Sequence, residues 1–177
     1  MYPPMVKFCW KGVFLMGFYH VAQICLNGHV ITDTYDQYPE FRQNFCDKCS
    51  AKTITKCPSC NSNIRGDYDD IDMVFISAGM TSAPAYCYNC GNPYPWTEDK
   101  LDATKELLAL DSKLSNEELE YLSSNLNSLL IDTPKTKLVA TKFKLGLSKL
   151  GKESAMAIRD IIVEIASESA KKIILGS

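Results

Sequence analysis

Four short motifs between positions 25 and 90 decide the fold of this chain: CLNGH at 25–29, FCDKC at 45–49, CPSC at 57–60 and YCYNC at 86–90. Each motif carries two soft or borderline metal ligands, and its short spacer lets both reach one ion. Zinc binds four such ligands in a tetrahedron, so the motifs predict two structural Zn²⁺ ions with no ligand left over. Disulfides or an iron–sulfur centre are the alternatives for the same cysteines. The eight candidate metal ligands are Cys25, His29, Cys46, Cys49, Cys57, Cys60, Cys87 and Cys90.

The order of the four ligand pairs allows two groupings. In sequential ribbons the first and second pairs share one ion, whereas in a cross-brace the first and third pairs do. Each half of the region repeats one order: a ligand pair, a long loop, and then an aromatic residue before Cys-x2-Cys, at Phe45-Cys46 and Tyr86-Cys87. This internal repeat favours sequential sites. The predicted sites are Cys25, His29, Cys46 and Cys49 for one ion, and Cys57, Cys60, Cys87 and Cys90 for the other.

The composition is that of an ordinary globular chain of one or two domains, with 177 residues, 46% apolar and 23% charged. A formal net charge of −2 argues neither for nor against nucleic acid as a partner. Cys9 alone lies outside the motifs, and the paired spacing of the other cysteines indicates metal binding in a reducing compartment rather than a secreted disulfide scaffold. No stretch approaches the roughly 18 apolar residues of a membrane span. We therefore expect a cytoplasmic protein.

The fold class that the sequence predicts is α+β: a small zinc-ribbon region with short β-hairpins, followed by an α-helical C-terminal region. Three segments are expected, namely an N-terminal extension at 1–15, a double zinc-ribbon domain at 16–96 and a helical domain at 97–177. The extension is apolar, contains two prolines and has no clear period. It is interpreted as an upstream extension of the domain, with an arm that docks on a partner as the alternative.

Two other features of the ribbon region are interpreted as structural, with a further metal site as the alternative. His20 is expected to pack in a strand rather than to bind metal. The acidic segment 66–72 lacks the defined glycine and the closing glutamate of a calcium loop, so it is predicted to be a solvated turn. The apolar residues 73–76 that follow predict a buried strand, and the alternation at 52–56 predicts a short one.

From Thr97 onward the pattern is helical, and four helices are predicted. Thr97 is expected to cap a helix that runs to about Leu110. A capping box at 115–118 begins the second helix, and Thr133 with Pro134 begins the third, which runs to about Leu150. The fourth is expected from about 154 to 175.

Charge is unevenly distributed along these helices. Residues 98–132 carry nine acids and three lysines, whereas residues 134–152 carry six lysines and no acid. We expect the basic helix to pair with the acidic ones. The alternative is a basic amphipathic helix that binds nucleic acid, an anionic membrane surface or an acidic partner.

The motif region resembles the family called domain of unknown function 2321, which consists of uncharacterised bacterial proteins. The likeness rests on CLNGH at 25–29, FCDKC at 45–49, CPSC at 57–60 and YCYNCGNPYPWT at 86–97, and covers the chain from about Met16 to the first helices. It implies zinc binding and a bacterial source, and no known activity. More loosely, FCxxC followed by CPxC is similar to double zinc ribbons, or zinc fingers, in general. That pattern is cysteine-only, and His29 departs from it.

These features predict a non-enzymatic zinc-binding module that mediates protein–protein interaction or assembly, with a protein partner or by self-association. A site closed by four protein ligands has no position for water or substrate, which argues against zinc catalysis. Metalloprotease, P-loop, nucleophile-elbow and dinucleotide motifs are absent from the sequence. An enzyme is therefore the weakest hypothesis, and it would need water in place of Cys25 or His29.

The alternative function is nucleic-acid binding by basic residues around the motifs and on the lysine-rich helix. Exposed tyrosines and Trp96 would supply stacking surfaces. The aspartates of 67–72 and the near-neutral net charge weigh against it. The candidate nucleic-acid-binding residues are Lys48, Lys52, Lys56, Arg65, Lys135, Lys142 and Lys149, and the candidate stacking residues are Tyr86, Tyr88, Tyr94 and Trp96.

Overall fold

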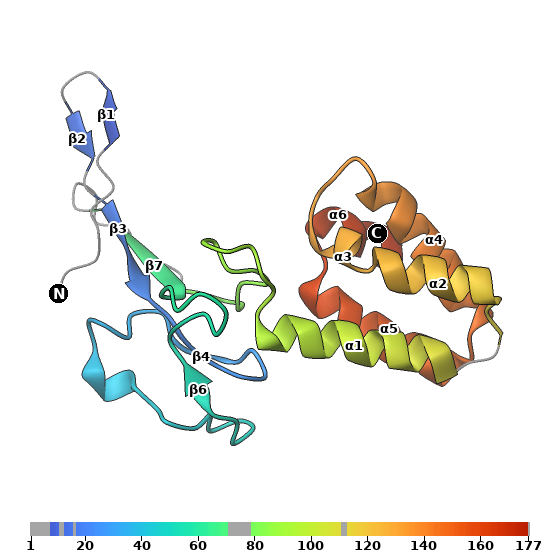
Figure 1. Ribbon diagram of the computed structural model, residues 1–177, viewed down its shortest axis with the longest axis horizontal. Helices are drawn as coiled ribbons and strands as arrows, with labels where there is room; N and C mark the ends of the chain where they lie inside the picture. The colour runs from blue at the N-terminus through green and yellow to red at the C-terminus, as the bar shows by residue number, and fades with distance from the viewer. Residues whose placement is uncertain (1–7, 11–12, 16, 71–78, 111–112, 177) are drawn as a thin grey trace. The chain divides into compact units, whose positions relative to one another are not determined.

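The computed structural model describes residues 8–10, 13–15, 17–70, 79–110 and 113–176. The chain divides into two compact units, residues 1–96 and residues 97–177 (Figure 1). Short antiparallel strands form the first unit and helices form the second, which confirms the α+β class. The strand expected at 73–76 lies outside the described residues.

A three-stranded antiparallel sheet supports the first ligand pair. Its central strand is β4 (Gln23–Cys25), with β5 (Val30–Thr32) on one side and β6 (Thr53–Ile54) on the other. The side-chain amide of Gln23 is buried and donates to the Gln43 carbonyl at 2.6 Å and to the Thr53 hydroxyl at 2.9 Å. These bonds tie the loop before the second ligand pair to the sheet, so the two pairs are held at a fixed separation.

A second strand pair joins segments that are far apart in the sequence. Strand β3 (Gly17–Val21) pairs with β7 (Arg65–Asp70), and Tyr19 lies opposite Tyr68. A Cβ atom on Gly66 would lie 1.9 Å from the Asp33 carbonyl oxygen, so only glycine permits this close approach. The turn predicted at 66–72 is therefore wrong for residues 66–70, because β3 supplies a pairing partner that the sequence alone does not reveal.

The remaining elements of this unit are short. Strands β1 (Phe8–Trp10) and β2 (Val13–Leu15) pair with each other within the expected extension. A single 3₁₀ turn, η1 (Pro39–Phe41), lies in the loop between β5 and the second ligand pair. His20 is buried on β3, and its Nδ1 lies 3.2 Å from the Asp36 carboxylate, so the packing role expected for it is confirmed.

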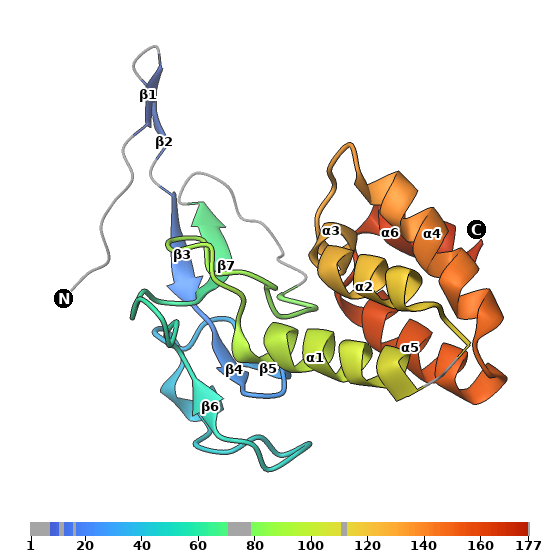
Figure 2. The same cartoon turned by 45° about the vertical axis from the view of Figure 1, so that its right-hand side comes forward.

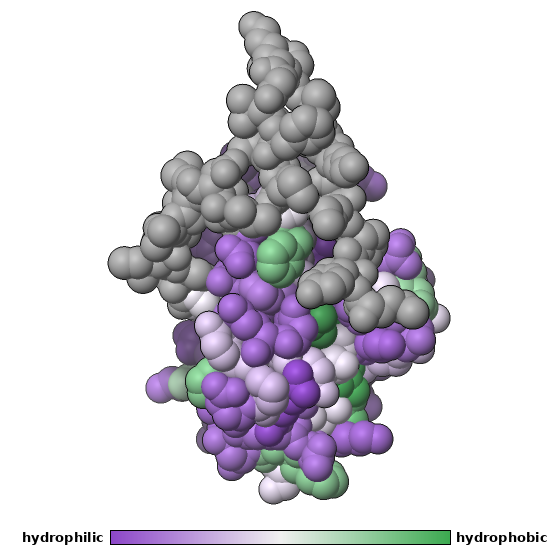
Figure 3. Space-filling view, turned by 90° about the vertical axis from the view of Figure 1, so that its left-hand side faces the viewer, coloured by the Kyte–Doolittle hydropathy of each residue, from purple (hydrophilic) through white to green (hydrophobic). Residues whose placement is uncertain are grey.

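The core of the first unit is small. Tyr94 and Trp96 stack at a centroid distance of 4.7 Å, and the Trp96 indole N–H donates to the Pro84 carbonyl at 2.9 Å. On the face shown in Figure 3, polar residues predominate and apolar ones occur in small separate groups. The core cluster consists of Ala22, Ile24, Cys57, Ile64, Cys87, Tyr94 and Trp96.

The second unit is helical. Helices α2 and α4 lie side by side in both ribbon views (Figures 1 and 2). Among the described residues, no helix is both long enough and apolar enough to cross a membrane. The helices are α1 (Pro95–Leu110), α2 (Asn116–Asn125), α3 (Asn127–Leu130), α4 (Thr136–Lys149), α5 (Lys152–Ile165) and α6 (Glu168–Leu175).

Helix boundaries agree with the predictions where a cap is strong and differ elsewhere. The capping box of Ser115 and Glu118 begins α2 as predicted. Thr97 is not a cap, because α1 starts two residues earlier with Pro95, which suits a first helical position. Similarly, α4 begins only at Thr136, whose hydroxyl donates to the Ile131 carbonyl at 2.7 Å and accepts from the Thr133 N–H at 2.8 Å.

The last predicted helix is two helices. Ala166 leaves the helical conformation, and the Ser167 side chain caps α6 by accepting from the Ala170 N–H. The Ser167 N–H is itself bonded to the Leu129 carbonyl at 2.8 Å, so the break is fixed by a contact that is distant in sequence. Helix α4 ends at Lys149 and Gly151 is the N-cap of α5, whereas Gly146 lies inside α4.

Candidate metal centres

The first cluster is built from a hairpin turn and a loop. Cys25 ends β4, and His29 immediately precedes β5. Gly28 lies in the turn between them with φ of 86°, a conformation that glycine adopts without strain. The Cys25 N–H donates to the His29 carbonyl at 3.0 Å, which closes the hairpin and turns both side chains toward one point.

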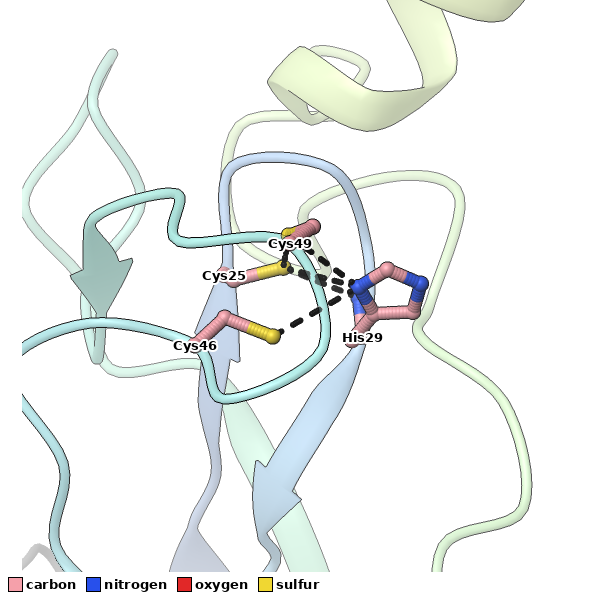
Figure 4. A group of neighbouring side chains, drawn as sticks. All are labelled: Cys25, His29, Cys46 and Cys49. Carbon is pink, nitrogen blue, oxygen red and sulfur yellow. Dashed lines mark hydrogen bonds between the residues drawn. The ribbon is translucent and has the colours of Figure 1, made fainter.

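The Cys46 and Cys49 side chains converge on the same point (Figure 4). The His29 Nδ1 atom lies 3.3 Å from the Cys49 sulfur, 3.5 Å from that of Cys25 and 3.6 Å from that of Cys46. The sulfurs of Cys25 and Cys49 are 3.7 Å apart. Nδ1 is therefore the histidine atom that faces the three sulfurs.

The second cluster contains four cysteines. The Cys57 and Cys90 sulfurs are 3.8 Å apart, and those of Cys60 and Cys87 are 3.7 Å apart. In each cluster all ligand atoms lie within 4.8 Å of one another, so either group could hold a metal ion. The structure thus brings the eight predicted residues together sequentially, as Cys25, His29, Cys46 and Cys49, and as Cys57, Cys60, Cys87 and Cys90.

The three Cys-x2-Cys motifs share one turn, which we call the knuckle. In each, the N–H of the fourth residue after the first cysteine donates to that cysteine's carbonyl at 2.8–2.9 Å. That fourth residue has a positive φ in every case: 58° for Ser50, 61° for Asn61 and 73° for Gly91. The turn gathers backbone N–H groups around the thiolates, so the local sequence prepares both ligands before any long-range contact forms.

The distances between ligand atoms fit a tetrahedral ion. With a metal–sulfur distance of about 2.3 Å, a tetrahedron has sulfur–sulfur edges of about 3.8 Å. The observed edges of 3.7 and 3.8 Å match this value. A disulfide would require about 2.0 Å, and all seven motif cysteines are free. The disulfide alternative is therefore wrong for these residues, and a single tetrahedral ion fits each cluster.

Hydrogen bonds lower the pKa of Cys49 in the first cluster, and those of Cys60 and Cys87 in the second, toward the thiolate form that binds metal. In the first, a backbone hydrogen bond from Ala51 lowers the pKa of Cys49 to about 6. In the second, burial raises the pKa of Cys87, but hydrogen bonds from Ser62 and from backbone N–H groups outweigh it and lower the value to about 5. In each cluster these hydrogen bonds favour the charged form of a thiol that faces the other ligands.

Two polar side chains around the second cluster were not identified from the sequence. The Ser62 hydroxyl lies 3.1 Å from the Cys60 sulfur and 3.3 Å from that of Cys87. The Asn89 side-chain amide donates to the Cys60 sulfur at 3.5 Å. Both stand two residues after a cysteine, a position from which a short polar side chain returns to the knuckle. That spacing is the signal that could have found them.

Within the first unit, the candidate nucleic-acid-binding residues lie at more than one place. Lys52 and Lys56 line a groove of about 530 Å³ beside β6, together with Phe45, whose side chain is 64% exposed. Lys48 is exposed within the second ligand motif. Arg65 lies elsewhere, with its guanidinium over the rings of Tyr88 at 3.8 Å and Tyr19 at 4.6 Å.

Of the other candidates, the three lysines of the helical unit lie on or beside α4. Lys135 precedes the helix, Lys142 lies 3.9 Å from the ring centroid of Tyr121, and Lys149 forms an ion pair with Glu118. Among the proposed stacking residues, Tyr94 and Trp96 are buried in the core, so that part of the prediction is wrong. Their rings supply much of the apolar surface that the small core of the first unit buries. Tyr88 remains 52% exposed.

A family model described as an uncharacterised protein conserved in bacteria, DUF2321, matches residues 18–174. The chain belongs to this family. No curated protein and no solved structure matches it. The family match extends through the helical unit, so the two units together, and not the metal clusters alone, are what the family shares.

Proposed function

We propose that this DUF2321 protein is a non-enzymatic zinc-binding module that engages a protein partner in the bacterial cytoplasm. The supporting observation is that the eight ligands form two complete sets of four. A zinc ion with four protein ligands is coordinatively closed, so it stabilises a fold and does not activate water or substrate. A reducing cytoplasm keeps the free thiols available for the ions.

The mixed ligand sets favour zinc over other metals. Thiolate with imidazole in a tetrahedron is typical of zinc, and four thiolates are typical of zinc or iron. One chain that builds both sets with the same edge length is most simply explained by the same ion in both. The zinc ions would hold the knuckles as a rigid platform, while the helical unit supplies a surface for a partner.

The test is metal content per chain, by elemental analysis of protein purified without added metal. We expect two zinc ions in the wild-type protein and one in Cys25→Ser and in Cys57→Ser. Cys9→Ser is the matched control, because Cys9 lies outside the ligand motifs, and it should retain two. A wild-type value of one zinc, or an iron signal, would contradict the closed zinc sites and favour an enzyme or redox function.

Single-stranded nucleic-acid binding is a second candidate, favoured by the groove beside β6. The exposed ring of Phe45 lines it together with Lys52 and Lys56, and no acidic side chain from the described part of the chain does so. Aromatic stacking with flanking cations is the usual composition of a site for unpaired bases. The affinity for a labelled oligothymidylate, measured by fluorescence anisotropy, should fall steeply with salt concentration. It should also be lower in Lys52→Gln/Lys56→Gln. The control is Lys105→Gln, which changes an exposed lysine on α1. If Lys52→Gln/Lys56→Gln binds the oligonucleotide as tightly as this control does, the function is excluded.

A further inference from the structure

The surface of α4 exposes two leucines. Leu138 is 56% exposed and Leu145 is 59% exposed. They are seven residues apart, so they occupy the same face of the helix two turns from each other. Single exposed leucines are common on monomers. A pair aligned on one helix face, beside a hollow, is a more specific feature.

The hollow lies between α2 and α4. It has a volume of about 520 Å³, and most of its lining surface is apolar, with Leu122, Tyr121 and Leu145 among the side chains. Charged side chains line it as well, namely Glu117, Glu118, Lys142 and Lys149. Gly146 contributes no side chain, since a Cβ atom there would lie 2.7 Å from Leu122 Cδ1. Leu122 thus packs directly against the α4 backbone at Gly146, and Leu145, the next residue toward the N-terminus, lines the hollow beside it.

Opposite charges border this apolar strip. Helix α2 carries three glutamates and no basic residue, while α4 carries four lysines and no acid. Inside the chain only part of this charge is used: Lys149 pairs with Glu118, and Lys142 lies over Tyr121. Within the described residues, no partner is found for the carboxylates of Glu117 and Glu120 or for the ammonium groups of Lys137 and Lys144.

The unpaired charges form two parallel edges. Glu117 and Glu120 are three residues apart on one face of α2, and Lys137 and Lys144 are seven apart on one face of α4. The surface is thus acidic along one edge, apolar in the middle and basic along the other. When two copies pack face to face about a two-fold axis that runs along the strip, the acidic edge of each copy lies against the basic edge of the other. That is the self-complementarity a two-fold interface requires.

We infer that the partner of the α2–α4 face is a second copy of this chain, bound in a two-fold dimer. Leu138 and Leu145 of each protomer enter the apolar strip of the other, and Lys137 and Lys144 meet the other's Glu117 and Glu120. A uniformly acidic partner would be repelled by the two glutamates, and a basic one by the lysines. The inference rests on the proposed function, because it names the partner of the interaction module.

Charge reversal tests the inference directly. Sedimentation velocity across the micromolar range should show a wild-type dimer that dissociates at lower concentration. Lys137→Glu/Lys144→Glu should be monomeric because both edges become acidic, and Glu117→Lys/Glu120→Lys should be monomeric because both become basic. An equimolar mixture of these two variants should form a heterodimer, since each edge then meets its opposite. Only a partner that is a second copy makes the mixture recover.

Two further measurements complete the design. Lys152→Glu/Lys172→Glu reverses two exposed lysines on α5 and α6 and should dimerise as the wild type does. Leu138→Ser/Leu145→Ser should weaken dimerisation at least tenfold. A monomeric wild type, or two reversal variants that dimerise normally or fail to recover on mixing, would overturn the inference. Because zinc content is measured on the same samples, failure of the dimer and failure of the metal sites are distinguished.

Discussion

The two units of this molecule reach a stable fold by different means. In the first, the core cluster contains seven buried residues, and two of them, Cys57 and Cys87, are candidate metal ligands. In the second, the largest fully buried side chains are apolar, among them Leu129, Phe143 and Ile162. We therefore expect the first unit to gain from metal binding the stability that the second obtains by removing apolar surface from water.

This difference follows from chain length and secondary structure. Strands of two to six residues bury little area, and a domain this small is marginal without a metal or a disulfide. Helices of 14 residues, such as α4 and α5, each present an apolar stripe to their neighbours. The contrast predicts that the stability of the two units can be changed separately.

Removal of metal is expected to have the largest effect. A zinc chelator should unfold residues 1–96, because each structural zinc contributes about 10–16 kcal/mol to such folds. The helical unit, which has no ligands, should keep its circular dichroism at 222 nm. Limited proteolysis followed by mass spectrometry should then place the new cleavages before position 97. Loss of the helical signal on chelation would show that the units are not independent.

A core truncation should have the reverse selectivity. Phe143→Ala removes a fully buried ring from the helical unit and should cost about 3–5 kcal/mol of unfolding free energy. Leu110→Ala is the matched control, since Leu110 is 79% exposed and its loss should cost less than about 0.5 kcal/mol. Urea unfolding followed at 222 nm measures both. Zinc content should stay at the wild-type value in each variant, and a loss of zinc in Phe143→Ala would contradict the separation.

Within the metal unit, two glycines with the same backbone but different surroundings sharpen the comparison further. Gly28 has φ of 86° and its Cβ position lies 3.0 Å from Trp96 Cβ, whereas Gly91 has φ of 73° and open space. Alanine at either site costs about 1–2 kcal/mol of backbone strain, and at Gly28 it also displaces the indole. Competition with a chromophoric chelator should show about tenfold weaker zinc binding for Gly91→Ala and a larger loss for Gly28→Ala. Equal losses would mean that Trp96 does not support the first site.

The metal region was largely predictable because its information is local. A Cys-x2-Cys spacing and a residue that tolerates positive φ specify the knuckle within six positions, as at Cys57 to Ser62. The capping box at Ser115 is local in the same sense. These features need no knowledge of what lies elsewhere in the chain, so sequence alone places them correctly.

Other elements depend on partners that are distant in sequence. Residues 66–70 form a strand because they pair with β3, in which Tyr19 lies opposite Tyr68 although it is 49 positions earlier in the chain. The break at Ala166 depends on the Leu129 carbonyl, and the burial of Tyr94 and Trp96 depends on the shortage of other core residues. Local propensity cannot weigh such contacts. The single last helix, the acidic segment and the stacking residues were wrong for that reason.

The smallest predicted effect concerns a single charge in the helical unit. The Glu118 carboxylate accepts hydrogen bonds from Lys149 and from the Ser115 N–H. Both lower its pKa below the ordinary 4.5, and the contribution of Lys149 is the larger. A carboxylate whose pKa is lower in the folded state stabilises the fold at any pH above its unfolded-state pKa. This contribution is lost as the pH falls through the folded-state pKa. Glu118→Gln keeps the capping geometry and removes only the charge.

The expected result is a small destabilisation of the helical unit at pH 6 that disappears at about pH 3, where the wild-type carboxyl is protonated as well. Thermal unfolding at 222 nm of the wild type and the variant at both pH values measures it. Glu117→Gln is the control, because the neighbouring glutamate has no basic partner within the described residues and should show little change at either pH. A destabilisation by Glu118→Gln that persists at pH 3 would assign the effect to packing. The ion pair would then contribute nothing to the stability of a unit that is held together by its apolar core.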